Sequence, residues 1–299
     1  MSKRESLLRY SAIINKLRRS PATLKEIVTY LENESEIQAY NLRTSQRTFQ
    51  RDLEDIRSLY GLDIQYDFSK KKYHIENSAN EALSDRMLEA FDTYNILRLS
   101  GGLHNFLDFE ERKSGGLEYF HGLLHAIKNQ LQINLKYRSF GQNSPSERKI
   151  HPYLLKEFKN RWYLIAKDLR DERIKTYALD RIFETEITRK KYINPVGYNP
   201  KEQFKHSFGI ISSVDGSIPE RVVLSFNRDQ GRYVETLPLH HSQRILSESA
   251  SELRIELTVY IAVDFIKELL SFGPDVKVIE PKELADKLKA MHQLAFEQY

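Results

Sequence analysis

Two groups of side chains in this sequence could bind an anion, and the first surrounds its single tryptophan. Trp162 lies in the run Arg161-Trp162-Tyr163-Leu164, which continues through Ile165 and Ala166 and is flanked by Lys159 and Lys167. A short run of aromatic and β-branched residues predicts a β-strand. Because the run interleaves large aromatic rings with cations, it suits a site for a flat ligand, an anionic ligand or both.

The second group lies on a predicted helix that begins after Ser45. Ser45 is a suitable N-cap, and Phe49, Leu53 and Ile56 follow at helical spacing, so they should pack inward. The opposite face then carries polar side chains that can hydrogen-bond base edges and phosphates, namely Gln46, Arg47, Gln50 and Arg51. A recognition helix uses its N-terminal turns in this way, and the alternative is an amphipathic helix that only packs.

A basic hairpin is predicted after Gly61. Residues 62–66 alternate between apolar and polar side chains, Lys70-Lys71-Lys72 marks a turn, and Tyr73-His74-Ile75 returns. Such a hairpin is placed to meet DNA phosphates. The candidate DNA-binding residues are therefore Ser45, Gln46, Arg47, Thr48, Gln50, Arg51, Lys70, Lys71 and Lys72.

Two further helices should support this surface. Residues 4–19 carry an approximate apolar stripe that Pro21 ends, and Thr23 with Glu26 fits a capping box at the start of a second, short helix through Leu31. Three helices followed by a basic hairpin predict a winged helix-turn-helix.

Residues 45–75 resemble the DeoR-type winged helix-turn-helix. The matching residues are Ser45, Arg47-Thr48, Arg51-Asp52-Leu53 and Tyr73-His74-Ile75. One departure is that residues 33–44 are too many for the tight turn of about 3–4 residues expected between the two helices. The third helix therefore either starts earlier or follows an insertion that shifts its pose.

Charge is distributed unevenly along the 299 residues, whose net charge is +4. Residues 129–191 carry a net +7 and residues 1–78 a net +3, whereas residues 79–128 and 192–299 each carry −3. The two basic segments suggest two places for anions such as nucleic acid, and a solvated basic face is the alternative. The absence of cysteine excludes disulfides and cysteine-based zinc sites. Without a signal peptide or an apolar run of about 18 residues, we expect a soluble cytoplasmic protein and no membrane partner.

Short strands follow one another through residues 131–182, which suits a small, strongly bent barrel. This segment resembles the WYL domain in four motifs, which are Tyr137 at a strand end, Arg148-Lys149-Ile150-His151-Pro152, Trp162-Tyr163-Leu164 and Leu179-Asp180-Arg181-Ile182. The resemblance implies an Sm-like β-barrel with a pocket that senses a ligand or binds nucleic acid. Lys175 stands where the family often has arginine, so the ligand can differ.

Alternation divides the central strand into two faces. Arg161, Tyr163 and Ile165 share one face, and Trp162 with Leu164 shares the other, which we expect to be core. Several cations pointing together need an anion, although pairing with Asp180 or Glu157 is an equal alternative for any one of them. The candidate ligand-binding residues are Tyr137, Arg148, His151, Tyr153, Arg161, Tyr163, Lys175, Arg181, Arg221, Arg228 and Arg232.

The C-terminal part alternates predicted strands and helices. Strands are expected at residues 221–226, 253–260 and 275–281, and helices at 263–270 and 282–298. This order resembles the WCX extension that follows many WYL domains. The resemblance implies a small α+β domain that can pack across a dimer, and His240-His241 is expected on the surface.

Residues 79–128 are expected to form a helical connector, with Ser84 as a cap and an apolar stripe from Leu117 to Ile127. Apolar faces on a connector need a partner, so a homodimer interface is expected here. His121 and His125 are four residues apart, but no acidic ligand follows at a metal-motif spacing, so metal binding is not favoured.

The expected organisation is an α+β multidomain protein. A winged helix-turn-helix occupies residues 1–78, a helical linker 79–128, an Sm-like WYL barrel 129–191 and a WCX domain 192–299. The resemblances imply a transcriptional regulator, more a repressor than an activator, that binds a palindromic double-stranded DNA operator as a homodimer.

The same resemblances imply that the WYL barrel senses a nucleotide or a single-stranded nucleic acid. They also imply a link to phage defence or DNA damage. A non-specific nucleic-acid-binding module is the alternative. A nuclease or nucleotide hydrolase is less favoured, because no Walker loop, acidic metal cluster or Ser-His-Asp array occurs, and no cofactor is expected.

Overall fold

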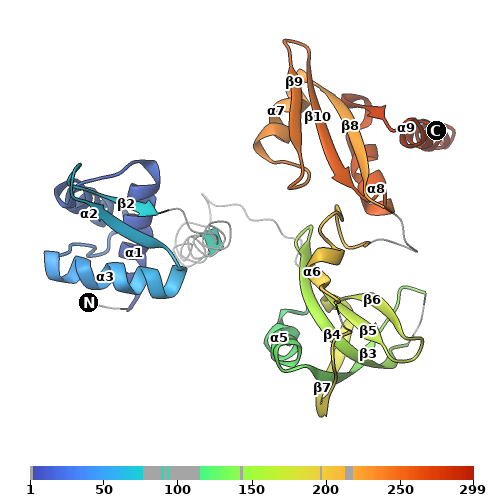
Figure 1. The fold of residues 1–299 in the computed structure, drawn as a ribbon, viewed down its shortest axis with the longest axis horizontal. Helices are drawn as coiled ribbons and strands as arrows, with labels where there is room; N and C mark the ends of the chain where they lie inside the picture. Colours follow the sequence, from blue (N-terminus) through green and yellow to red (C-terminus); the bar gives the residue numbers. More distant parts are fainter. Residues whose placement is uncertain are drawn as a thin grey trace. The chain divides into compact units, whose positions relative to one another are not determined.

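The computed structural model describes residues 3–76, 89–90, 93, 115–141, 144–195, 197–212 and 218–299. The chain divides into two compact units, one up to residue 110 and the other from residue 111. Figure 1 draws the elements of each. Most of the expected helical connector, including Ser84, lies outside the described residues. The expected limits of the four domains stay a prediction.

The first unit consists of helices α1 (Lys3–Arg19), α2 (Leu24–Gln38) and α3 (Gln46–Tyr60), followed by a hairpin of β1 (Asp63–Asp67) and β2 (Lys72–Glu76). The capping box is confirmed, because the Thr23 hydroxyl accepts from the Glu26 amide while the Glu26 carboxylate accepts from the Thr23 amide at 2.7 Å. The predicted start of α3 after Ser45 is also confirmed.

The second helix is longer than predicted. It runs to Gln38 and ends at Ala39 in the left-handed region, so the chain crosses to Ser45 in a shorter connection than residues 33–44 suggested. The Ser35 hydroxyl accepts from the Leu42 amide at 3.0 Å, and Leu42 is fully buried. Part of the long segment of residues 33–44 is therefore helical, because α2 continues to Gln38. The start of α3 is not earlier than expected.

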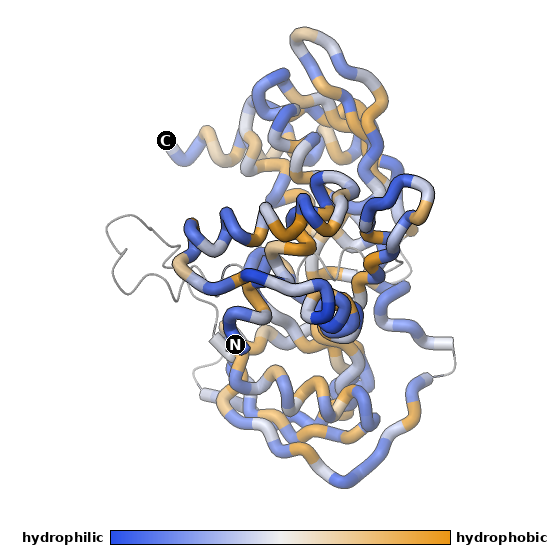
Figure 2. The backbone as a smooth tube through the Cα atoms, turned by 90° about the vertical axis from the view of Figure 1, so that its left-hand side faces the viewer, coloured by the Kyte–Doolittle hydropathy of each residue, from blue (hydrophilic) through white to orange (hydrophobic). Residues whose placement is uncertain are grey.

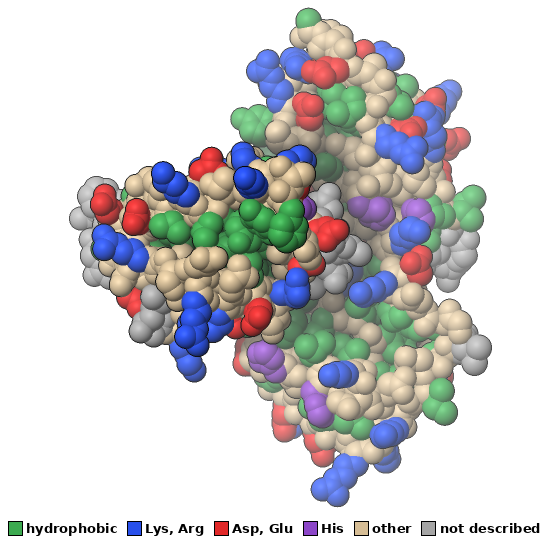
Figure 3. Space-filling view, turned by 60° about the vertical axis from the view of Figure 1, so that its left-hand side comes forward, with side chains coloured by type: hydrophobic (Ala, Val, Ile, Leu, Met, Phe, Trp, Pro, Cys, Tyr) green, Lys and Arg blue, Asp and Glu red, His purple; other side chains and the backbone are tan. Residues whose placement is uncertain are grey.

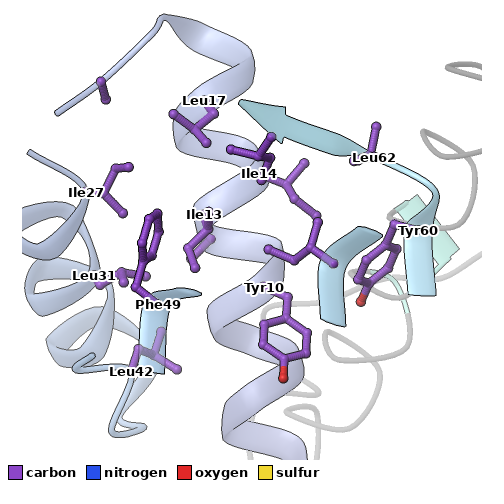
Figure 4. Packing of buried hydrophobic residues seen from close by; sticks show 14 of the residues in the cluster. Tyr10, Ile13, Ile14, Leu17, Ile27, Leu31, Leu42, Phe49, Tyr60 and Leu62 are labelled. Carbon is purple, nitrogen blue, oxygen red and sulfur yellow. The ribbon is translucent and has the colours of Figure 1, made fainter. Parts of the chain in front are cut away.

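Phe49 of α3 is the centre of the first hydrophobic core. It is fully buried, and in Figure 4 its ring lies between Ile13 of α1 and the α2 side chains Ile27 and Leu31. Burying an aromatic side chain in this way stabilises a fold by about 2–3 kcal/mol relative to exposing it. The inward face of α3 is thus fixed, which also fixes the direction of its opposite, polar face.

The second unit contains the short helix η2 (Leu117–Tyr119), α5 (Phe120–Asn129) and a five-stranded antiparallel sheet in the order β6-β5-β4-β3-β7. The strands are β3 (Leu131–Tyr137), β4 (Ser146–Phe158), β5 (Arg161–Asp168), β6 (Arg173–Ala178) and β7 (Ile182–Lys191). Leu123 and Ala126 of α5 pack on one sheet face with Leu164. Trp162 packs on that face too, with its ring 4.8 Å from Phe120, as predicted for a core residue.

The expected closed barrel is wrong. The edge strands β6 and β7 are joined through the short helix η3 (Leu179–Arg181), and no sheet in the described ranges closes on itself. The backbones of β6 and β7 do not pair with each other. At the end of β6, the Ala178 amide donates instead to the Tyr137 hydroxyl at 3.2 Å. A register shift between Pro152 and Leu154 bends β4, so the sheet is curved but open.

The C-terminal part has a four-stranded antiparallel sheet in the order β11-β8-β10-β9. Its elements are α6 (Pro200–Gln203), β8 (Glu220–Asn227), α7 (Arg228–Thr236), β9 (Arg244–Glu248), β10 (Glu252–Val259), α8 (Val263–Ser271), β11 (Val276–Glu280) and α9 (Lys282–Phe296). The predicted α+β character is confirmed. Neither α7 nor β9 was predicted, since every residue of β9 is exposed and lacks a buried face.

Hydrophobic and hydrophilic residues alternate along most of the backbone in Figure 2. Among the described helices, none combines the length and apolarity needed to cross a membrane.

Candidate nucleic-acid interface and ligand site

The N-terminal turns of α3 present an exposed polar surface. The Ser45 hydroxyl accepts from the Thr48 amide at 3.2 Å and so caps the helix. Ser45 and Thr48 are thereby used locally, while four side chains of these turns are exposed, namely Gln46, Arg47, Gln50 and Arg51. Within the described part of the chain, no carboxylate forms an ion pair with Arg47 or Arg51. These two guanidinium groups are therefore available to an external anion.

A buried ion pair holds this helix from behind. Arg9 of α1 donates from Nε and Nη2 to the two carboxylate oxygens of Asp52 at 2.7 and 2.8 Å, and both side chains are fully buried. One turn further, Tyr10 donates to Asp55 at 2.6 Å, and burial together with that bond raises the pKa of Tyr10 to about 12. Asp52 is thus a positioning residue next to Arg51, which sequence reasoning missed because its partner is distant in the chain.

The hairpin is tied to the helices and presents two of its three lysines. Lys70 and Lys71 are exposed in the turn, whereas Lys72 is half-buried as the first residue of β2. Asp67 accepts from the Ser69 hydroxyl and the Lys70 amide, and these bonds lower its pKa to about 2. A carboxylate thus fixes the turn and lies 3.5 Å from Lys70.

Tyr73 joins the hairpin to α3 and to the segment just before α2. Its backbone pairs with Ala22 before α2, with N···O distances of 2.8 and 3.0 Å. Its hydroxyl accepts from Gln50 of α3 at 3.4 Å, and its ring packs against Phe49. The hairpin and the exposed face of α3 therefore form one surface. In Figure 3, the first unit shows cationic, acidic and hydrophobic side chains side by side.

In the central sheet, two predicted ligand residues, Arg148 and Lys175, converge on one buried acid. Asp168 is fully buried and lies 3.7 Å from Arg148 and 2.7 Å from Lys175, and Tyr177 donates to it at 3.1 Å. Burial opposes the ionisation of Asp168, but the hydrogen bonds from Lys175 and its other partners hold its pKa below the usual value. For Arg148 and Lys175 the pairing alternative therefore holds with Asp168, an acid that the sequence analysis did not consider.

The cations near the Leu-Asp-Arg-Ile motif are also engaged. Arg181 donates from Nε and Nη2 to the Arg138 carbonyl at 2.9 and 2.8 Å, and its guanidinium covers the rings of Tyr137 and Phe140. Arg161 differs, because its half-exposed side chain lies 3.9 Å from Asp180. A pairing this long at the surface leaves Arg161 free to meet another anion.

The remaining ligand candidates fall into separate places. His151 stacks on Tyr192 with ring centroids 4.4 Å apart, and burial lowers the pKa of His151. Tyr153 is buried in the same aromatic cluster and packs on Tyr198, while Tyr163 is half-buried on β5.

The three C-terminal arginines lie outside that cluster. Arg221 on β8 pairs with Glu256 at 2.9 Å and also with Glu280, while Arg228 on α7 pairs with Glu248 at 2.5 Å. Arg232 is exposed on the same helix. No described cavity joins these arginines to the candidates of the central sheet.

A cavity of about 450 Å³ is lined by residues of β3, β4 and β7. Of the predicted residues it includes only Arg148. Two of its carboxylates are already engaged, since Lys136 bonds Glu184 and Asn134 donates to Glu186 at 2.7 Å. His240, expected on the surface, is buried and lines a different cavity with His241. No group of three metal-ligating side chains occurs in the described ranges, His121 and His125 included.

Comparison with known proteins places two domains on the chain. The WYL domain matches residues 118–187, and the WCX domain matches residues 218–295. No curated protein matches. Among solved structures, proteasome accessory factor B/C of Arthrobacter aurescens has 16% sequence identity and a TM-score of 0.36, and its match covers 96% of this chain and 46% of that one. The chain thus spans about half the length of that protein.

A second solved structure, described as a CRISPR Cas-related protein, has 10% identity and a TM-score of 0.38, with 97% of this chain and 83% of that one covered. The chain is an α+β protein that contains a match to the WYL domain. More specifically, a WCX match follows the WYL match, which confirms the resemblances to these two domains.

Proposed function

We propose that the protein is a DNA-binding transcriptional regulator whose first unit is a winged helix-turn-helix. The observation that carries this proposal is the surface formed by α3 and its hairpin. Arg47 and Arg51 lack an ion-pair partner among the described residues. The helix that carries them, α3, is held against α1 by the fully buried ion pair of Arg9 and Asp52. A rigid helix with exposed Gln and Arg in its first turns suits the major groove, and Lys70 and Lys71 suit the flanking phosphates.

The regulator would act as a homodimer on a palindromic operator, more as a repressor than as an activator. The half-sites would lie about 10 base pairs apart, or a multiple of that spacing. A nucleotide or single-stranded nucleic acid bound at the WYL domain would change the operator affinity, with the exposed Arg161 and the half-buried Tyr163 as contacts. A role in phage defence or DNA damage is part of the same proposal.

The test is footprinting on the promoter of the protein's own operon with scrambled DNA as the reference. Arg51→Ala should weaken operator binding about 10- to 100-fold, as expected for loss of a base contact worth about 1–3 kcal/mol. Arg57→Ala is the matched control, because Arg57 is exposed on the last turn of the same helix and pairs with Asp63. Equal losses in both variants would contradict the placement of the recognition surface.

A non-specific nucleic-acid-binding module is the alternative function. It would protect scrambled DNA as well as the promoter, and Arg51→Ala would then weaken both DNAs equally. The regulator proposal requires preferential protection of the promoter.

A further inference from the structure

A second cavity, of about 340 Å³, lies where β4 meets the segment that carries α6 and the turn before β9. Six of its lining side chains are polar or cationic, and none of them is among the predicted ligand residues. They are Lys156, Lys201, Lys205, Ser207, His240 and His241. No aspartate or glutamate lines it.

The lysines of this cavity are poorly neutralised. Lys156 is half-buried, its Nζ lies 5.5 Å from the centre of the Phe204 ring, and burial lowers its pKa. Asp264, the acid that acts on Lys156, already accepts from the Ile210 and Ile211 amides through Oδ2. Lys205 lies 3.8 Å from Glu202, and both side chains are exposed, so this pair is worth little.

Ser207 is an independent sign of a missing ligand. Its side chain is only 4% exposed, yet its Oγ has no hydrogen-bond partner in the described part of the chain. A buried hydroxyl without a partner costs about 1–3 kcal/mol. Because Ser207 lines the cavity beside Lys205, a ligand oxygen there would satisfy it.

The two histidines report a positive environment, because nearby cations disfavour their protonation. His240 Nδ1 accepts from the Ser242 amide at 3.2 Å, and burial, then the neighbouring His241, His206 and Lys156, lower its pKa to about 4. His240 is therefore neutral at pH 7. His241 is exposed, and burial with the charges of His206, Lys205 and Lys156 lowers its pKa. Nearby cations thus oppose one another here, which an anion would relieve.

We propose that this cavity binds the phosphate group of a small phosphorylated ligand. Phosphate fits because it offers several acceptor oxygens and more than one negative charge to three ammonium groups and a hydroxyl. The volume lies at the lower end of the roughly 300–1,000 Å³ typical of ligand pockets, which favours a compact ligand. This site is separate from the DNA-binding function and from the predicted contacts of the central sheet.

The test is calorimetric titration of the full chain with inorganic phosphate and with a 5′-phosphorylated thymidine dinucleotide. Lys156→Met keeps the apolar stem but removes the charge, and the dissociation constant should rise about 10- to 100-fold. Lys205→Gln changes an exposed position and should raise the dissociation constant several-fold. It is the alternative test variant if Lys156→Met does not fold. Lys190→Gln on exposed β7 is the control for net charge and should leave binding unchanged.

The His241 ring should report binding directly. A bound anion raises the pKa of His241, so the His241 ring signal in NMR should shift on phosphate addition. Equal binding of both probes identifies a free phosphate ion as sufficient, whereas tighter dinucleotide binding identifies a nucleotide end. Binding of neither probe, or equal loss in Lys205→Gln and Lys190→Gln, would overturn the proposal.

Discussion

The first turns of α3 and the central sheet are both rich in cations, but the cations of α3 are exposed whereas two cations of the sheet are paired with a buried acid. On α3, Arg47 and Arg51 are exposed, and the neighbouring acid Asp52 is buried and bonds Arg9. In the sheet, Arg148 and Lys175 are drawn to the buried Asp168. The net charge of +7 over residues 129–191 therefore overstates how much positive charge this domain offers to a ligand.

This comparison teaches that the position of the acids matters more than the count of the bases. A buried carboxylate can either hold a helix so that its other face stays open, or consume the cations that a ligand would need. Asp52 does the first and Asp168 does the second.

The largest effect is expected from Asp52→Asn, which removes the carboxylate that the fully buried Arg9 guanidinium bonds through Nε and Nη2. Breaking a buried ion pair in this way should lower the free energy of unfolding of the first unit by about 3–5 kcal/mol. Urea denaturation followed by circular dichroism measures it.

Asp55→Asn is the matched control on the same helix. Asp55 accepts one hydrogen bond from Tyr10 and is only partly buried, so its loss should cost about 1 kcal/mol. If Asp52→Asn costs no more than this control, the ion pair does not hold α3.

The contrast also shows what the sequence could predict. Local patterns predicted the Ser45 cap, the inward face of α3, the hairpin and the core position of Trp162. They could not predict that Arg9 would meet Asp52 or that Arg148 and Lys175 would meet Asp168, because those contacts depend on how distant elements pack. The exposed strand β9 carries no burial pattern, and the polar end of α2 was taken for a connection.

A second, smaller loss of stability is expected from Asp168→Asn. Removing the charge leaves the nearly buried Arg148 without its acid, which should cost about 2 kcal/mol in the second unit. Because the folded state lowers the pKa of Asp168, its contribution is full above the unfolded pKa and is lost as the pH falls through the folded value.

Wild type should therefore lose this part of its stability on acidification below pH about 4, and Asp168→Asn should not. Parallel pH profiles for the two proteins would show that Asp168 carries no such contribution. Asp171→Asn is the control, since Asp171 also pairs with Lys175 but is exposed.

A smaller change is expected from Lys71→Ala in the hairpin turn. If Lys71 meets one phosphate, the slope of the logarithm of DNA affinity against the logarithm of salt concentration should fall by about 1, on promoter and scrambled DNA alike. Lys72→Ala is the comparison, because Lys72 is half-buried within β2 and should change the slope less. An unchanged slope in Lys71→Ala would place the hairpin away from the phosphates.

The smallest effect on stability is expected from Arg161→Ala, and it tests which cation of the central sheet is free for a ligand. Its long surface pairing with Asp180 should contribute less than about 0.5 kcal/mol, whereas Arg181→Ala removes two hydrogen bonds to Arg138 and should cost about 1–2 kcal/mol. Thermal unfolding ranks the two variants. If Arg161→Ala is the more destabilising, then Arg161 is structural like its neighbours, and the WYL sheet keeps no unused cation at its Trp-Tyr-Leu strand. If the expected order holds, a ligand that loses affinity in Arg161→Ala does so through lost contact, since the fold beneath it is intact.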